Sequence, residues 1–190
     1  MRQSRPGTRA DRTREQVLSA AARVLSMRPG SSLQDIVDES RIGRATLHRH
    51  FRTRDDLIRA LGFDAMERTA EAVRDSQLAS GPASAALRRL VEALIPLGDR
   101  FHYLMQEPSL EGDPQVDEAS ERLFAPISDL VRRGQEEGTF RSDLSVAWSA
   151  ALIETTLYAA WQAIHRGDLA PNQAVDVVMK TLLGGLGRGT

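Results

Sequence analysis

The sequence predicts an all-α protein, and three observations support this prediction. Apolar residues recur at helical spacing through most of the 190 residues, no segment alternates apolar and polar residues as a strand does, and breaks that contain glycine or proline divide the chain into about nine helices. Cysteine is absent, which excludes a disulfide framework and a thiolate metal site. With 41% hydrophobic residues, a chain of this length can bury a core without either support.

The first third of the chain predicts a group of four helices. A break at Pro29 and the adjoining glycine ends the first helix. The second helix begins at Ser32, whose hydroxyl and the carboxylate of Asp35 have the spacing of a capping box, in which each group accepts from a free backbone N–H. Gly43 permits a turn before a short third helix, and Thr53 caps a long fourth one. The four ranges are 11–27, 32–41, 44–50 and 54–77.

Further helices are predicted behind a break at residues 79–83. Gly138 suits the end of one of them, because a residue without a Cβ readily adopts the conformation of a C-terminal cap. Glycines after residue 183 predict a frayed tail. The ranges of these helices are 84–97, 101–106, 115–137, 144–166 and 172–183.

The most apolar segment, residues 146–164, predicts a buried helix rather than a membrane span. Glu154 lies at its centre, and a carboxylate at the middle of a bilayer costs roughly 2.5–3.5 kcal/mol. The arginine-rich N-terminus contains no apolar stretch of the kind that signals secretion. We therefore expect the protein in the cytoplasm.

Charge is distributed unevenly along the chain. Residues 1–60 hold 13 arginines and seven acidic residues, a net charge of +6, whereas residues 61–190 have a net charge of −7. A basic first third predicts contact with a polyanion. The alternative is a basic, disordered tail on an ordinary domain.

Residues 31–51 have the size of a helix-turn-helix, which is two short helices joined by a tight turn. The second helix of such a pair lies in the major groove of DNA and presents its N-terminal, outward residues to base edges. Arginine bonds guanine at two acceptors, and threonine or alanine contacts a thymine methyl group. Arg52 and Arg54 follow the second helix and are placed for phosphates. The outward residues of the second helix are Arg44, Ala45, Thr46, His48 and Arg49.

Residues 13–61 resemble the DNA-binding domain of the TetR family of bacterial repressors. The shared pattern is a hydrophobic second helix, a short recognition helix that ends in His50-Phe51, and an acidic residue before a leucine. The segment GTFRSDL, residues 138–144, is also similar to the link that precedes the dimerisation helices of the family. The matching positions are Ile36, Ile42, Thr46, Leu47, His50, Phe51, Asp56 and Leu57.

Some positions depart from the family pattern. His48 stands where the family has an aromatic residue, usually a tyrosine that contacts a phosphate, and a histidine can also donate to a phosphate. Arg41 and Gly43 replace the usual glycine before the turn and the usual serine at the start of the recognition helix. These departures concern the contact with DNA rather than the fold.

The resemblance implies a three-helix, helix-turn-helix DNA-binding head at residues 13–60 and a helical domain for effector binding and dimerisation at residues 61–190. Residues 1–12 are expected to form a flexible basic arm, which either reaches a neighbouring groove or stays a solvated tail. By the same resemblance Ser32 and Gln34 approach the phosphate backbone from the second helix. The arginines of the arm are Arg2, Arg5, Arg9 and Arg12.

Large side chains behind the head predict a pocket for a small molecule. In the family the centre of this domain encloses an apolar ligand cavity, and aromatic residues with a few polar groups are typical of such pockets. The alternative is that these residues are ordinary core. The lining predicts an apolar or aromatic effector. The pocket residues we expect are Phe101, His102, Tyr103, Met105, Trp148 and Leu152.

The last two predicted helices are apolar on more than one face. One face packs inward, and the second requires a partner, which a second copy of the chain would supply in a four-helix interface. A homodimer also matches the two half-sites of a pseudo-palindromic operator. The alternative is a larger monomer core. The interface residues we expect are Ile153, Leu157, Trp161, Ile164, Val175, Val178, Met179 and Leu182.

Nothing in the sequence predicts an enzyme, a cofactor or a metal site. The chain has no glycine-rich phosphate loop, no nucleophile elbow and no His-Glu-x-x-His motif, and His48 and His50 face different ways on a helix. We therefore predict a ligand-responsive DNA-binding regulator, a repressor released from its operator by a small molecule. The alternatives are an activator or effector-independent regulator of the same fold, and a helical binding or enzymatic protein with a degenerate head.

Overall fold

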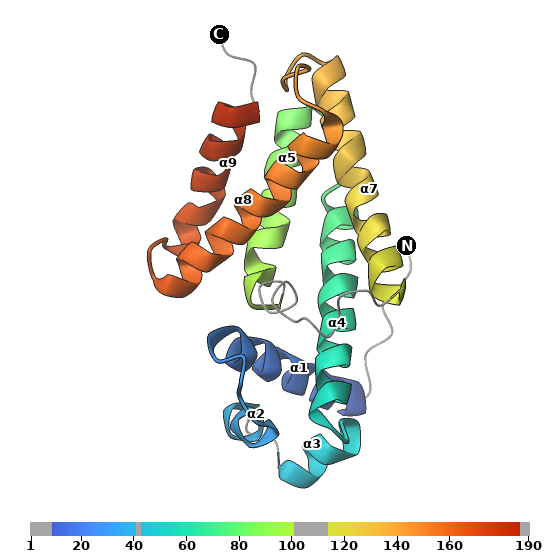
Figure 1. The fold of residues 1–190 in the computed structure, drawn as a ribbon, viewed down its shortest axis with the longest axis vertical. Helices are drawn as coiled ribbons and strands as arrows, with labels where there is room; N and C mark the ends of the chain where they lie inside the picture. The colour runs from blue at the N-terminus through green and yellow to red at the C-terminus, as the bar shows by residue number, and fades with distance from the viewer. Residues whose placement is uncertain (1–8, 41–42, 101–113, 187–190) are drawn as a thin grey trace.

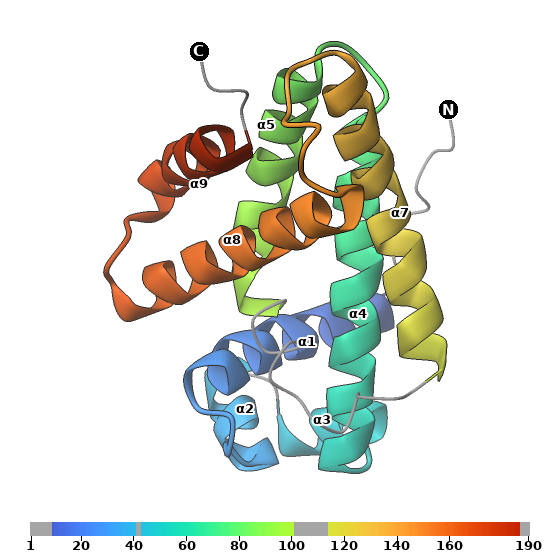
Figure 2. The same ribbon diagram turned by 45° about the horizontal axis from the view of Figure 1, so that its top comes forward.

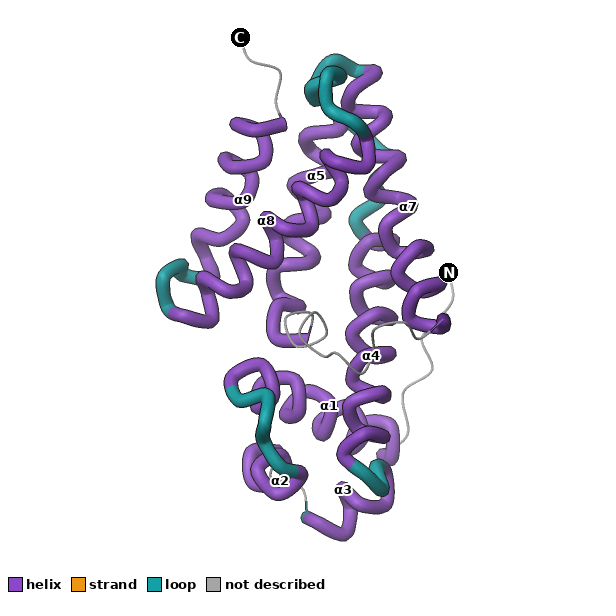
Figure 3. The backbone as a smooth tube through the Cα atoms, viewed as in Figure 1, coloured by secondary structure: helices purple, strands orange, loops and turns teal. Residues whose placement is uncertain are grey.

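A computed structural model describes residues 9–40, 43–100 and 114–186, and all regular structure within these ranges is helical, without a strand (Figures 1 and 3). This confirms the predicted all-α class. None of the described helices is long and apolar enough to cross a membrane. The helices are α1 (Arg9–Met27), α2 (Leu33–Ser40), α3 (Arg44–His50), α4 (Arg54–Asp75), α5 (Ala83–Leu94), the 3₁₀ helix η1 (Ile95–Leu97), α7 (Pro114–Glu136), α8 (Val146–Arg166) and α9 (Pro171–Leu186).

The described residues bury two separate apolar cores. The first belongs to the head, by which we mean residues 9–61, where α1 packs against α2 and α4 and the short α3 closes the group. Each of these helices has one apolar face, so the four faces meet in a single cluster. The residues of the head core are Val17, Leu18, Ala21, Ala22, Val24, Leu25, Ile36, Leu47, Phe51, Leu57, Ile58 and Leu61.

The second core belongs to the body, by which we mean residues 62–186. The long helix α4 leaves the head and continues beside α7 and α5, while α8 crosses α7 and packs on α9 (Figures 1 and 2). Phe140 lies within this core because Gly134 has no side chain, and a Cβ at position 134 would clash with the Phe140 ring. The head and the body are thus joined along one continuous helix.

Two capping boxes start helices of the head: the one at Ser32 was predicted, and Thr53, predicted as a cap, also forms one. The hydroxyl of Ser32 accepts from the Asp35 N–H at 3.3 Å, and the Asp35 carboxylate accepts from the Ser32 N–H at 2.7 Å. The same exchange joins Thr53 and Asp56 at the start of α4, at 3.0 Å in both directions. The hydroxyl and N–H of Ser32 donate to the Asp35 carboxylate and lower its pKa below the ordinary value.

Several predicted boundaries require correction. The first helix begins at Arg9, with Asp11 in its first turn near the positive end of the helix dipole, so Arg9 and Arg12 lie in a helix rather than in a flexible arm. The predicted helix 84–97 ends at Leu94 and continues as η1, because Pro96 has no N–H for an α-helical bond. The last helix runs through Gly184 and Gly185, two of the glycines expected to fray, and ends at Leu186. The predicted helix at 101–106 lies outside the described residues.

Candidate DNA-binding surface and ligand cavities

Helix α3 turns its charged side chains away from the head. Leu47 is fully buried and Phe51 is 3% exposed, so these two residues anchor the helix to the core. Gly43, in extended conformation, precedes the helix and caps it without a side-chain hydrogen bond. Four of the five residues predicted to read base edges are exposed, and Thr46 is half-buried. The four are Arg44, Ala45, His48 and Arg49.

A hollow of about 370 Å³ lies between α2, α3 and the start of α4. It brings together five of the nine side chains that the sequence assigned to DNA, although they come from three helices. The hollow is lined by Ser32, Leu33, Gln34, Val37, Arg44, His48 and Arg54.

Arg54 has a structural role that the sequence did not predict. Its Nη2 donates to the carbonyl of Pro29 at 2.8 Å, and its Nε donates to the carbonyl of Ser31 at 3.4 Å. The side chain therefore ties the turn between α1 and α2 to the first residue of α4. Arg52, two residues earlier, is exposed and remains the stronger candidate for a phosphate contact.

His50 packs against Phe51 in the head. It is half-buried, and its ring centroid lies 6.3 Å from that of Phe51. Arg14 covers the same phenyl ring, with its guanidinium carbon 5.8 Å from the centroid, which is the geometry of a cation–π contact. Among the described residues, no group of three or more His, Cys, Asp or Glu side chains could hold a metal ion.

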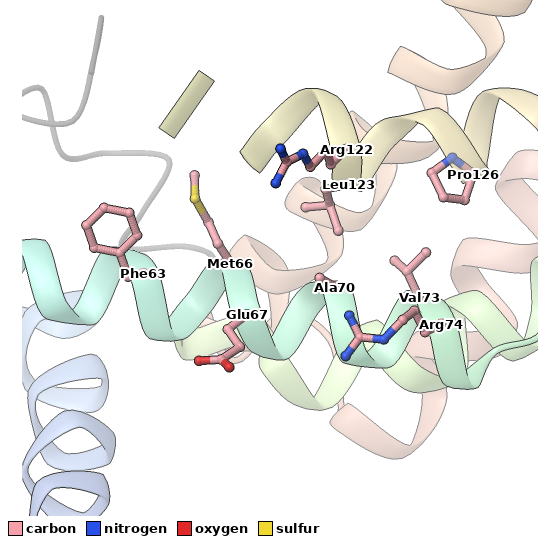
Figure 4. A pocket seen from close by; sticks show the side chains of 9 residues that line it. All are labelled: Phe63, Met66, Glu67, Ala70, Val73, Arg74, Arg122, Leu123 and Pro126. Carbon is pink, nitrogen blue, oxygen red and sulfur yellow. The ribbon is translucent and has the colours of Figure 1, made fainter. Parts of the chain in front are cut away.

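The body contains a cavity of about 470 Å³ between α4 and α7, which we call the α4–α7 cavity. Met66 and Val73 of α4 and Leu123 of α7 point into the space between the two helices (Figure 4). Charged groups of both signs, Glu67, Arg74 and Arg122, complete its wall. The remaining lining residues are Phe63, Ala70 and Pro126.

Leu123 also lines a second, smaller space, which we call the inner void. This void has a volume of about 20 Å³ and is lined mainly by apolar side chains around one carboxylate, that of Glu154. Glu154 is half-buried, and this burial raises its pKa above the ordinary value because a charged carboxylate is poorly solvated there. The other residues around the void are Thr69, Leu94, Phe124, Leu157 and Trp161.

Comparisons with known proteins agree with this geometry. Residues 17–61 match the family model described as bacterial regulatory proteins, tetR family. The chain is 31% identical to the HTH-type transcriptional repressor LfrR of Mycolicibacterium smegmatis, over 93% of this chain and 91% of the relative. The chain belongs to the TetR family. It is therefore a DNA-binding transcriptional regulator, and the prediction that it is not an enzyme is confirmed by the nature of its relatives.

Two further similarities extend over nearly the whole length of this TetR-family chain. It is 25% identical to the HTH-type transcriptional regulator NfxB of Pseudomonas aeruginosa, over 90% of this chain and 92% of that protein. The crystal structure of LfrR from Mycobacterium smegmatis in complex with proflavine matches with 29% identity and a TM-score of 0.77, covering 94% of this chain and 98% of that one. The family's fold therefore includes the body as well as the head.

One of the residues assigned to a ligand pocket, Trp148, requires correction. Trp148 is 62% exposed, because it lies on the outer side of α8, and it lines neither the α4–α7 cavity nor the inner void. Leu152, one turn later, is half-buried and lines neither space. The other four predicted pocket residues, Phe101, His102, Tyr103 and Met105, lie outside the described residues.

The residues assigned to a dimer interface also require correction. Most of them lie inside the core of this chain. The inward face of α8 carries Ile153 and Trp161, and the inward face of α9 carries Val178. Ile164 and Val175 are half-buried against the same core. The face of α8 that was expected to meet a partner is therefore the one that faces the core of this chain. The buried residues are Ile153, Leu157, Trp161, Val178, Met179 and Leu182.

None of the residues that line the α4–α7 cavity was predicted from the sequence to line a pocket. Its apolar wall includes Phe63, which is 36% exposed although it is a large hydrophobic residue on a helix already anchored by Leu57 and Leu61. The sequence did contain a signal for this cavity, because Phe63 does not lie on the buried face of α4. A large apolar residue in such a position indicates a second contact surface.

Proposed function

We propose that this regulator is a repressor that binds a pseudo-palindromic operator as a homodimer and is released by a small apolar or aromatic molecule. The observation that supports this most strongly is the α3 surface, where exposed Arg44, His48 and Arg49 surround a helix anchored by fully buried Leu47. A rigid helix with basic, outward side chains at its N-terminal end suits the major groove.

Within the head, the DNA-binding residues take different roles. Arg44 and Arg49 are placed for guanine, and Ala45 and Thr46 for a thymine methyl group. Ser32, Gln34, His48 and Arg52 would donate to phosphates and position the head on the duplex. Arg54 supports this surface by holding the turn at Pro29 and Ser31. The two separate cores support a division near residue 61 into a DNA-binding head and an effector-binding body.

The body supports an aromatic effector with a positive charge. The α4–α7 cavity is of the size of small-molecule sites and is mostly apolar, and Leu123 separates it from the inner void, where Glu154 is the carboxylate. A half-buried carboxylate among Phe124, Leu157 and Trp161 is stabilised by a cation that brings its own apolar surface. The relative LfrR has been crystallised with proflavine, an aromatic compound.

The outer face of α8 and α9 supports the homodimer. Trp148, 62% exposed, and Val177, 43% exposed, lie on these two helices. The exposed stripe that follows Trp148 along α8 is made of small residues, which permit close approach of a second helix. The residues of this stripe are Ala151, Thr155 and Ala159.

The DNA-binding proposal is tested by selecting genomic DNA fragments with the full chain and titrating the best fragment with salt. We expect a pseudo-palindromic site and an affinity that falls steeply with salt, because phosphate contacts release counterions. Arg44→Ala should reduce discrimination at one base pair by about 1–3 kcal/mol, whereas Arg132→Ala on the exposed side of α7 should leave binding unchanged. Weak binding without sequence preference would contradict the proposal.

The effector proposal is tested with proflavine as the probe. Proflavine should bind the chain with a change in dye fluorescence and should lower its affinity for the selected fragment. Glu154→Gln should weaken proflavine binding at least about tenfold, because the variant lacks the charge that the cation faces. Proflavine binding that is unaffected both by this substitution and by Leu123→Trp, which would fill the space between the cavity and the void, would show that the effector site lies elsewhere.

A further inference from the structure

Four charged side chains meet where the head joins the body. Arg100, 17% exposed, donates from Nε to the Asp64 carboxylate at 2.9 Å and from Nη2 to the Glu15 carboxylate at 3.3 Å. Its Nη2 also donates to the hydroxyl of Ser19 at 2.7 Å. Arg68 completes the group by donating to Asp64 at 3.3 Å and by pairing with Glu15. We call these four charged residues the junction cluster.

The junction cluster joins three parts of the chain that are distant in sequence. Glu15 and Ser19 lie on α1 in the head, Asp64 and Arg68 lie on α4, and Arg100 lies in the helical residues 98–100 that follow η1 in the body. The position of the cluster coincides with the gap between the two apolar cores, since the head core ends at Leu61 and the body core begins at Val73 on α4. Polar contacts, which depend strongly on geometry, therefore link α1 to the body here.

The segment that carries Arg100 contacts Trp161, a residue that lines the inner void. Two residues before Arg100, Gly98 lies against Trp161, and a Cβ at position 98 would come within 2.5 Å of the Trp161 Cδ1. Trp161 is 4% exposed, donates from its indole nitrogen to the Ile95 carbonyl at 3.2 Å, and forms part of the wall of the inner void. The segment 95–100 thus contacts the void wall at one end and the head at the other.

The inner void is too small to accept an aromatic ring as it stands. Its volume of about 20 Å³ corresponds to roughly one water molecule. A ligand that reaches Glu154 must therefore displace a wall residue, and Trp161 is the wall residue that is wedged against Gly98. Because no side chain stands between Trp161 and the backbone at Gly98, displacement of the indole toward this segment moves its backbone.

We propose that the junction cluster couples the effector site to the head, through displacement of Trp161, movement of the backbone at Gly98, and rearrangement of the bonds from Arg100 to Glu15 and Asp64. This proposal rests on the proposed function, because it describes how occupancy of the body cavity reaches the DNA-binding surface. It assigns a positioning role to Arg100, which contacts neither DNA nor effector.

The first test measures the coupling itself. The dissociation constant for the selected DNA fragment is measured with and without saturating proflavine in the wild type, in Arg100→Gln and in Arg88→Gln. Arg88 is a matched control, because it forms an ion pair between α5 and α9 at 3.1 Å without contacting the head. We expect proflavine to change the wild-type and Arg88→Gln constants at least about tenfold, a usual size for allosteric coupling, and to change that of Arg100→Gln less than about twofold.

Direct titration of proflavine separates loss of coupling from loss of binding. Arg100→Gln should still bind the dye, and by thermodynamic reciprocity its dye affinity should be the same with and without DNA. An Arg100→Gln variant that keeps the wild-type response would overturn the proposal. A wild type that binds the fragment but ignores proflavine would instead contradict the proposed effector class, and the second test would then decide.

The second test needs no effector. Gly98→Ala introduces a methyl group against Trp161 and should change the affinity for DNA at least about fivefold, in the direction that effector binding does. The same substitution in the Arg100→Gln background should produce no further change, because residues that act through one contact are not additive. Gly30→Ala is the control, since a Cβ there meets nothing within 4 Å. Circular dichroism checks that each variant is folded, and additive effects of Gly98→Ala and Arg100→Gln would overturn the proposal.

Discussion

The head and the body of this protein are both helical, but they differ in how many apolar faces each helix has. In the head, α2 and α3 are short, and each turns a single apolar face to one core, while its other residues, apart from Ala45, are charged or polar. In the body, α8 is apolar on its inner side, where Ile153 is buried, and also on its outer side, where Trp148 is exposed. A single apolar face determines the orientation of a helix, and two apolar faces do not.

This difference explains which functional residues could be assigned in advance. Four of the five residues of α3 that were expected to be exposed are exposed, because burial of Leu47 leaves only one way to place the helix. On α8, a large apolar residue lies on each side, and the prediction placed Trp148 inside and Ile153 outside, the reverse of what the structure shows. When a helix has two apolar faces, its sequence does not show which face lines a cavity and which forms an interface. That assignment requires the positions of the neighbouring helices.

The two tryptophans give the largest expected contrast. Trp161→Ala should lower the free energy of unfolding by about 3–5 kcal/mol, because it removes an enclosed ring from the body core. Trp148→Ala removes a side chain that is 62% exposed and should leave the folded chain intact while raising the dissociation constant of the proposed dimer. Urea denaturation and sedimentation equilibrium measure the two effects. Equal losses of stability would mean that the inner and outer faces of α8 are not distinct.

Two arginines sharpen the comparison inside the head. Arg54→Ala should lower the stability of the head by about 1–2 kcal/mol, because the carbonyls of Pro29 and Ser31 lose a charged donor. Arg52→Ala should leave stability unchanged, weaken binding to all DNA sequences alike, and reduce the slope of log K against log salt by about one unit. Thermal unfolding and salt titrations of the two variants provide the measurement. The opposite assignment of roles would follow if Arg52→Ala were the destabilising change.

Loss of a capping box should have a smaller effect. Ser32→Ala should destabilise the head by about 0.5–2 kcal/mol, since the Asp35 N–H loses its acceptor at the start of α2. The low pKa of Asp35 means that its ionised form stabilises the fold above the pKa of the unfolded chain, and that this contribution disappears as the pH falls through the folded pKa. The difference between Ser32→Ala and the wild type should therefore shrink in acid. A difference independent of pH from 7 to about 2 would exclude the Asp35 carboxylate from the cap.

Substitution of Glu154 should cause the smallest change in stability, and it should stabilise the fold, whereas the substitutions above destabilise it. Burial raises the pKa of Glu154, so the folded chain binds this proton more tightly than the unfolded chain, and the ionised carboxylate opposes folding once the pH exceeds the folded pKa. Glu154→Gln should therefore be slightly more stable than the wild type at neutral pH, and the advantage should vanish in acid. Glu136→Gln, at an exposed position, is the control. A destabilised Glu154→Gln variant at pH 7 would mean that the carboxylate has a stabilising partner.

The helical class, the limits of most helices and the DNA-binding role of the chain follow from its residues without knowledge of the packing. These features depend on local causes: the hydroxyls of Ser32 and Thr53 start their helices, and Gly138 and Gly167 end theirs with positive φ. The order of these signals along residues 13–61 also matches a family pattern, which is why the DNA-binding role follows from the residues alone.

Only the tertiary structure decided the inner and outer faces of α8, the role of Arg54 and the position of the cavities. Each depends on groups distant in sequence: Arg54 bonds to carbonyls 23 and 25 residues away, and Arg100 meets Glu15 across 85 residues. Arg54, which binds carbonyls, and Arg52, which is proposed to contact a phosphate, cannot be told apart from the residues around them. Packing separates them, because it determines which acceptors lie within hydrogen-bonding distance.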